Sequence, residues 1–201
     1  MKHTLIFFAI LFSTALLAQE EQVVFSKASV YGGFGGPLIE LTSMNGQTGV
    51  MGGGGGGVIV NDFFFGGFGQ GGNFAEHVID NRRYPINFGY GGLWVGYVTP
   101  THKAIHFFSS IKIAGGGISI SENRDNNNNS LYEEAVFVAQ PEAGVEVNLW
   151  KWFRVALTGD YRIVCGIKGN ELGGLHNSDF NALGMTLTLR FGKFYRNKAE
   201  E

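Results

Sequence analysis

Alternation of apolar and polar residues with a period of two runs through most of the chain after its first eighteen positions. In the clearest stretch, from Leu183 to Gly192, Leu, Met or Phe occupies every second position, and Gly, Thr or Arg occupies the positions between. This period is typical of β-strands that have one apolar and one polar face. The pattern recurs in residues 105–113, 145–149 and 155–163, and helical periodicity is almost absent. The sequence therefore predicts an all-β fold.

Polar breaks divide the pattern into eight segments, at about residues 27–41, 48–60, 63–75, 84–98, 104–121, 133–149, 153–167 and 179–193. The connections at 61–62, 99–103 and 150–152 are short, those at 76–83, 122–132 and 168–178 are longer and more polar, and the first, at 42–47, is intermediate. Short turns and both termini at one end, with long loops at the other, are typical of transmembrane β-barrels. We predict a closed, antiparallel, eight-stranded transmembrane β-barrel.

Residues 1–18 have the layout of a secretory signal peptide. Lys2 supplies a basic start, Leu5 to Leu17 an almost continuous apolar stretch, and Ala18 a small residue before polar positions. The apolar stretch is shorter than the roughly 20 residues of a membrane-spanning helix. We predict export with cleavage near Ala18, a barrel over residues 19–195 and a polar tail over 196–201. Besides the barrel, only a soluble secreted fold remains open.

The composition narrows the function classes. Glycine supplies 32 of the 201 residues, and charged residues make up 16% and hydrophobic residues 44%, which is too apolar for a disordered chain. The 15 basic and 17 acidic residues give a net charge of -2, so no nucleic-acid-binding surface is expected.

Cys165 is the single cysteine and excludes an internal disulfide. Its apolar neighbours predict a packed small side chain, with a reactive thiol as the alternative.

Three motifs add to the leader and to the eight-segment rhythm: Gly32 to Gly36 (GGFGG), Phe63 to Phe68 (FFFGGF) and Leu187 to Phe191 (LTLRF). Together these features resemble the small eight-stranded outer-membrane β-barrel proteins of Gram-negative bacteria, and the glycine- and phenylalanine-rich texture is most similar to members of unassigned function from the Bacteroidetes. The resemblance implies an outer-membrane location, with outer-membrane lipids and the barrel-insertion machinery as partners. Such barrels often end on an aromatic residue that the machinery reads, whereas here residues 196–201 follow Tyr195.

The period of two does not reveal which face of the strands points outward. A soluble sandwich or a lipocalin-like barrel turns its apolar face inward, whereas a membrane barrel turns it toward lipid. Low charge, long strands and aromatic residues near the strand ends favour the membrane. In residues 87–94 the apolar row, Phe88, Tyr90 and Trp94, is then expected to face lipid. The aromatic residues predicted at the membrane interface near the short turns are Trp94, Tyr97, Trp150, Trp152 and Phe153.

The polar faces would then line the interior. The predicted interior charge network is Lys112, Glu142, Glu146, Arg154, Asp160, Arg162 and Arg190. The interior of an eight-stranded barrel is just wide enough to be filled by side chains, and charges there need partners. We therefore predict an ion-paired plug that conducts no solutes; the alternative is that residues near strand ends, Arg154 first, are hydrated.

Two glycine-rich stretches are assigned structural roles. Residues 52–57 satisfy a G-x-G-x-x-G pattern, but neither a Lys-Ser or Lys-Thr pair nor a helix follows, so a phosphate-binding loop is not expected. Glycines here would let strands approach closely or leave room for bulky residues from facing strands. At residues 115–117 the apolar positions change from odd to even, as Ile118 and Ile120 show. This change predicts a β-bulge.

The sequence offers little for catalysis or metal binding. No histidines have a recognised zinc spacing with a third ligand, and the polar stretch 124–129 lacks the acidic spacing of a calcium loop. His77 with Asp80, or His176 with Ser178 and Asp179, could form a nucleophile and base set at the outer rim. We predict no catalytic, cofactor-binding or metal site, and no cofactor.

The function that we predict is that of a monomeric structural or loop-mediated surface-interaction protein of the outer membrane that is not an enzyme. The alternatives are a lipid-modifying outer-membrane enzyme and a soluble carrier in the periplasm or the medium.

Overall fold

The computed structural model describes residues 30–79, 81–98, 103–124, 127–168 and 174–194. The predicted signal peptide and the tail after Tyr195 lie outside the described residues. Among those described, no helix is long and apolar enough to span a membrane. The strands are β1 (Val30–Met44), β2 (Gln47–Val60), β3 (Phe63–Ile79), β4 (Arg82–Val98), β5 (Ile105–Arg124), β6 (Asn127–Trp150), β7 (Phe153–Cys165) and β8 (Ala182–Lys193), with one short 3₁₀-helix, η1 (Asn177–Asp179).

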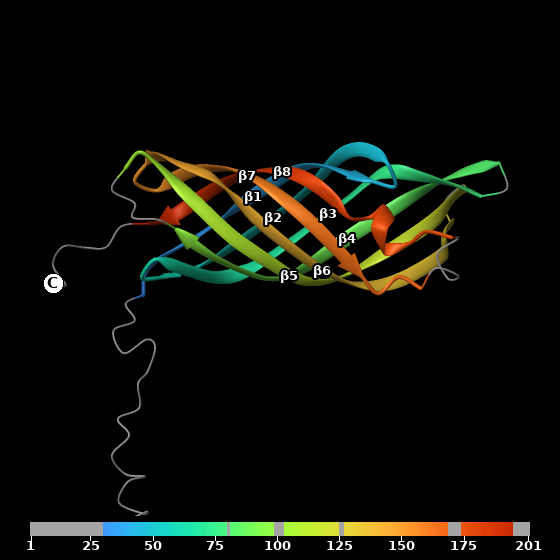
Figure 1. Ribbon diagram of the computed structural model, residues 1–201, viewed down its shortest axis with the longest axis horizontal. Coiled ribbons are helices and arrows are strands. Elements are labelled where there is room, and N and C mark those ends of the chain that lie inside the picture. Colours follow the sequence, from blue (N-terminus) through green and yellow to red (C-terminus); the bar gives the residue numbers. More distant parts are fainter. Residues whose placement is uncertain (1–29, 80, 99–102, 125–126, 169–173, 195–201) are drawn as a thin grey trace, which may run out of the picture.

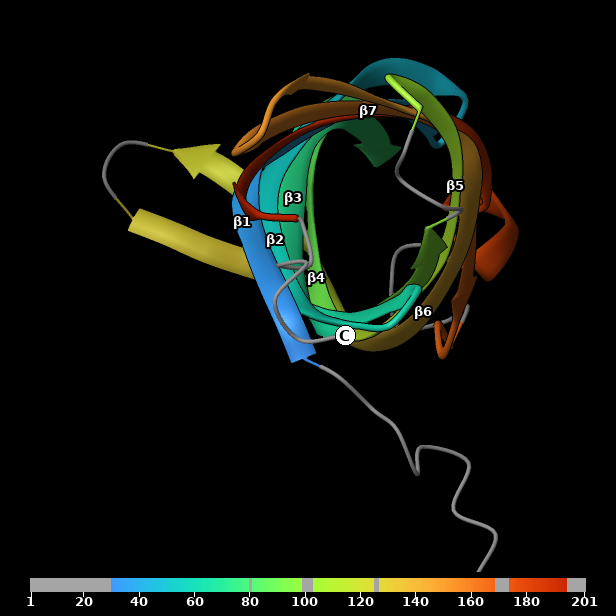
Figure 2. The same cartoon turned by 90° about the vertical axis from the view of Figure 1, so that its left-hand side faces the viewer.

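The strands form one closed antiparallel barrel in chain order. Each strand pairs with the next, and β8 pairs back onto β1 from Gly33–Lys193 to Leu41–Met185. Figure 2 shows the ring end-on, and Figure 1 shows the strands crossing the barrel at a tilt. The predicted closed, antiparallel, eight-stranded barrel is therefore confirmed. Closure leaves no unpaired strand edge along the barrel wall.

The two ends of the barrel differ. The turn end, on the left of Figure 1, carries the β2–β3 and β6–β7 turns, the start of β1 and the end of β8. The loop end carries the β1–β2 turn, the tips of β3–β4 and β5–β6, and the connection that includes η1. Asn45 and Gly46 both have positive φ, 50° and 73°, as a two-residue type I′ turn requires.

Two of the predicted long loops are mainly strand. β3 continues to Ile79 and β4 starts at Arg82, while β5 reaches Arg124 and β6 starts at Asn127. Figure 2 shows the far part of the β5–β6 hairpin, in yellow, projecting sideways from the ring. The extended parts of these hairpins lie past the barrel wall, where neither face of a strand has to be buried. They therefore need no alternation of apolar and polar residues, and the hydrophobic pattern misses them.

The parity change at residues 115–117 does not mark a bulge. β5 pairs without interruption with β4 from Ile86–Ile120 to Val98–Phe108, and Ile118 and Ile120 point inward, as His106 and Lys112 do. The bulge prediction was wrong because the strand keeps its faces and only the side chains on its inward row change, from polar His106 and Lys112 to apolar Ile118 and Ile120.

Large apolar side chains cover the outside of every strand. Exposed examples, in strand order, are Ile39, Val58, Phe65, Leu93, Phe107, Phe137, Leu157 and Leu183. Cys165 is also exposed at the end of β7, which corrects the expectation of a packed thiol, because odd positions of β7 point outward.

Candidate functional site: the barrel interior

The turn-side cluster of the interior is built around one carboxylate, Glu146. Its two oxygens lie 2.8 Å from Arg154 Nη1 and 2.7 Å from Arg190 Nη1, and Oε1 is also 3.0 Å from His106 Nε2. All four side chains are buried. Strand register makes this meeting possible, because His106 pairs with Glu146 across β5–β6 and Arg154 with Arg190 across β7–β8.

Aromatic rings surround these arginines. The guanidinium of Arg190 lies 3.9 Å from the ring centroid of Phe108 and 4.7 Å from that of Phe34, and Arg154 lies 4.0 Å from that of Phe194. Cations over ring faces are attracted electrostatically, most strongly where water is excluded. The rings therefore fill the lumen and also stabilise the charges.

The middle cluster pairs Lys112 with Glu142. Lys112 Nζ is 3.0 Å from Glu142 Oε2, and both side chains are buried. Trp94 Nε1 donates to Glu142 Oε1 at 2.9 Å, and the Ser110 hydroxyl donates to the same oxygen. The ammonium also lies 5.3 Å from the ring centroid of Trp94.

In the loop-side cluster, Arg162 pairs with Glu40 rather than with Asp160. Arg162 Nη1 is 3.3 Å from Glu40 Oε1, and its other nitrogens donate to the backbone oxygens of Phe180 and Ser43 at 2.9 and 2.6 Å. The Asp160 carboxylate instead accepts from Gln140 Nε2 at 2.7 Å and Thr186 Oγ1 at 2.8 Å.

All seven predicted interior residues are thus buried inside the barrel, Arg154 included. Sequence reasoning missed Glu40, although the available signal was its place between Ile39 and Leu41, which both point outward. With Glu40, four acids (Glu40, Glu142, Glu146 and Asp160) face four bases (Lys112, Arg154, Arg162 and Arg190). The formal charges of these eight buried side chains therefore balance when all are ionised, with His106 left out.

Trp94 does not belong with the interfacial aromatics. Its side chain is fully buried between Phe34 and Phe64, with centroids 5.7 and 5.2 Å away. The expected lipid-facing row of β4, with Phe88 and Tyr90, faces the lumen instead, and it is Leu93 that points outward. The inward glycines of β2 leave the space, since Gly55 has Trp94 close to where a Cβ would stand.

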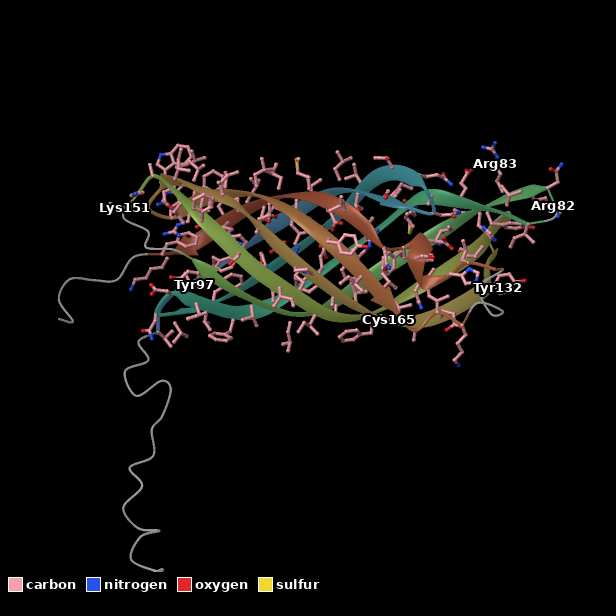
Figure 3. All side chains as sticks on the ribbon, in the orientation of Figure 1. Arg82, Arg83, Tyr97, Tyr132, Lys151 and Cys165 are labelled. Carbon is pink, nitrogen blue, oxygen red and sulfur yellow. The ribbon has the colours of Figure 1, made fainter. Side chains whose placement is uncertain are left out.

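The other predicted interfacial aromatics lie on the outside at the turn end. Tyr97, Trp150 and Trp152 are exposed and Phe153 is half-buried. Figure 3 labels Tyr97 and Lys151 at this end, and Arg82, Arg83 and Tyr132 at the other.

The described residues offer no assembled catalytic or metal centre. No group of three or more His, Cys, Asp or Glu among them could hold a metal ion. The Asp179 carboxylate accepts a hydrogen bond from the backbone nitrogen of His176 at 2.8 Å, which is a capping interaction, and Asp80 lies outside the described part. A hollow of about 790 Å³ near the loop end is lined by β3 to β6, including Asn87, Gly117 and Glu133, but by no histidine.

Neither a protein-family model nor a curated protein matches the sequence. Solved structures match the fold. Neisserial surface protein A (NspA) aligns with a TM-score of 0.58 and 10% identity, over 85% of this chain and 100% of that chain. The chain has the fold of the small outer-membrane β-barrels.

Two further structures agree. The N-terminal β-barrel domain of Pseudomonas aeruginosa OprF aligns with a TM-score of 0.51 and 12% identity, over 83% of this chain and 99% of that chain. Ail, the attachment invasion locus protein of Yersinia pestis, solved with the heparin analogue sucrose octasulfate, aligns with a TM-score of 0.50 and 13% identity, over 82% and 99%. At such identities the likeness is one of fold.

Proposed function

We propose that this chain is an exported, monomeric, integral protein of a bacterial outer membrane, whose filled interior conducts no solutes and which acts as a structural or surface-interaction protein. The observation that carries the proposal is the direction of the side chains. Apolar residues such as Leu93 and Phe107 are 65% and 73% exposed on the outside, while four acids and four bases are buried inside. This distribution suits hydrocarbon as the outer solvent.

A soluble carrier fits the same fold less well. Soluble monomers seldom expose contiguous apolar patches larger than a few hundred Å², whereas here every strand has exposed apolar residues. A carrier would also need an apolar cavity in its lumen. The side chains of Arg162, Lys112 and Glu146 occupy three levels of this lumen and are held there by ion pairs.

A lipid-modifying enzyme has little support from the loop end. Its candidate residues include His176 and Asp179, and the contact between them engages the backbone of His176 rather than its ring. We therefore propose a non-enzymatic role without a cofactor.

The parts that extend from the loop end are the candidates for contact with an outside partner. The β3–β4 hairpin carries exposed Arg82 and Arg83 near its tip, and Arg83 is ion-paired with Glu76 at 3.4 Å. NspA is described as a surface protein and Ail as an attachment protein, which favours a surface role for the shared fold by analogy only. Outer-membrane lipids and the barrel-insertion machinery are the partners that we propose, and the Bacteroidetes resemblance remains a prediction.

Gel migration and membrane fractionation test this proposal. A closed barrel stays folded in detergent at room temperature, so an unheated sample should migrate differently from a boiled one. The native protein should also sediment with the outer membrane and resist extraction by high salt. Recovery in the periplasm or the medium without detergent, with identical migration before and after boiling, would contradict the proposal.

A further inference from the structure

Four aromatic rings form a continuous stack on the outside of the turn end. This aromatic patch consists of Trp150, Trp152, Phe153 and Phe191, from β6, β7, β8 and the β6–β7 turn. Ring centroids are 4.7 Å apart for Phe153 and Phe191, 5.7 Å for Trp150 and Phe153, and 6.0 Å for Trp150 and Trp152, each pair stacked. Trp152 and Phe191 also stack, at 6.1 Å.

Backbone bonds hold the patch in place. The β6–β7 turn is only two residues long, and Gly192 N donates to Trp152 O at 2.9 Å, which ties this turn to β8. Phe153 pairs in register with both Trp150 and Phe191. The rings are therefore positioned before any ligand arrives, which lowers the entropy cost of binding.

The patch is not part of a protein core. Trp150, Trp152 and Phe191 are 59%, 57% and 41% exposed. Tryptophan is enriched at the headgroup level of membranes, where its ring is in apolar surroundings and its N–H reaches polar groups. The patch also continues the apolar outer surface of β7 and β8, through Leu157 and Leu187.

Three exposed lysines frame these rings. Lys151 lies between the two tryptophans in the sequence, and Lys193 follows Phe191 on the outward row of β8. Lys103 flanks the patch on the β5 side, because its backbone oxygen accepts from Asn148 Nδ2 at 3.0 Å. Within the described part of the chain none of the three is ion-paired. Asp62, an exposed acid in a described turn at this end, belongs to the β2–β3 turn, and β8 and β1 lie between β7 and β2.

We propose that the aromatic patch and its lysines bind the headgroup of an anionic phospholipid in the leaflet that surrounds the turn end. The rings would pack against the glycerol and the upper acyl chains, and the ammonium groups would contact the phosphate. A headgroup with net negative charge is preferred over a zwitterionic one, because the cationic part of a zwitterion is repelled by three lysines. This inference rests on the proposed membrane function.

Tryptophan quenching by brominated lipids tests the inference. The chain has three tryptophans; Trp94 is enclosed in the lumen, so quenching by lipid reports Trp150 and Trp152. The full protein is placed in vesicles with equal mole fractions of brominated phosphatidylglycerol or brominated phosphatidylcholine. The first should quench more, with a preference of up to about fivefold per lysine near the surface. A Trp150→Phe/Trp152→Phe variant gives the background from Trp94.

Two lysine variants test whether the preference for the anionic lipid arises at the aromatic patch. Lys151→Gln/Lys193→Gln should reduce it toward parity, whereas Lys168→Gln, which removes one charge at the loop end, should leave it unchanged. Equal quenching by both lipids in the native protein overturns the inference and leaves the membrane function standing. Absence of quenching by either lipid overturns both. An unchanged preference in the double lysine variant also overturns the proposed site.

Discussion

Glu146 is the anion on which the turn-side half of the interior depends, since it compensates Arg154 and Arg190 and contacts His106. Substitution Glu146→Gln keeps the shape of the side chain and removes the charge. The buried guanidinium groups of Arg154 and Arg190 would then have no carboxylate partner at this position, and the loss of such a partner lowers the free energy of unfolding by about 3–5 kcal/mol. Denaturant-induced unfolding in lipid vesicles, monitored by gel migration, should show a decrease of that size in the free energy of unfolding.

Glu133→Gln is the control for that measurement. Glu133 lies in the same strand, but it is exposed at the loop end, so its substitution should change the free energy of unfolding by less than about 0.5 kcal/mol. If Glu146→Gln proved as stable as this control, the turn-side cluster would not hold the barrel together.

At the residue scale, the sequence predicted the charges better than the rings. Each interior charge stands at an inward position of its strand, and burying it without a partner is so costly that its presence already implies a polar lumen. Trp94 and Tyr90 were placed wrongly, because an aromatic ring suits lipid and an apolar lumen equally well and the residue type alone does not distinguish them. The space that glycines on facing strands leave inside the barrel decides whether such a ring faces lipid or the lumen, and the position of that space depends on strand register.

β2 shows what its glycine run does at the scale of one element. Its odd positions point inward, and a Cβ at Gly55 would stand 2.9 Å from Phe68 Cβ and 3.1 Å from Trp94 Cε3. Gly55→Ala should therefore destabilise the barrel by about 1–3 kcal/mol through overpacking. Unfolding in the same vesicles measures this loss.

Gly52, three positions away in the same strand, is the matched control. Nothing lies within 4 Å of a Cβ placed there. Gly52→Ala should be neutral or slightly stabilising, because alanine reduces the freedom of the unfolded chain. Equal effects of the two substitutions would mean that the run acts only through backbone flexibility.

The strands themselves were largely readable from the sequence. The eight predicted segments match the observed strands in number and order, and the turn at Asn61 lies where the pattern breaks. The extensions of β3, β4, β5 and β6 were not readable, because their hydrogen bonds form beyond the level at which one face must be apolar. The apparent parity change at Gly115–Gly117 has a related cause. Which face of a strand carries the apolar residues depends on the surroundings of that face as well as on the geometry of the strand.

The closed barrel has three interior clusters stacked along its length, and their combined effect appears only at the scale of the whole molecule. The turn-side, middle and loop-side clusters each span several strands, and their four acids and four bases balance. Neutrality matters because an uncompensated ion in a lumen this narrow could be stabilised only by water or by a mobile counter-ion. A balanced, ion-paired interior needs neither.

This arrangement predicts that the folded protein is electrically silent. An ion entering from the loop end would have to break the pairs Arg162–Glu40 and Lys112–Glu142 in turn, and then pass Phe108 stacked on Arg190. Planar bilayer recordings should therefore show no conductance steps, whereas a known open porin inserted in the same bilayer should show them. Insertion of the silent protein is verified by its gel migration after recovery from the bilayer lipid. Reproducible steps from the folded barrel would show that the clusters part readily, and the filled interior would then have to be replaced by a gated one.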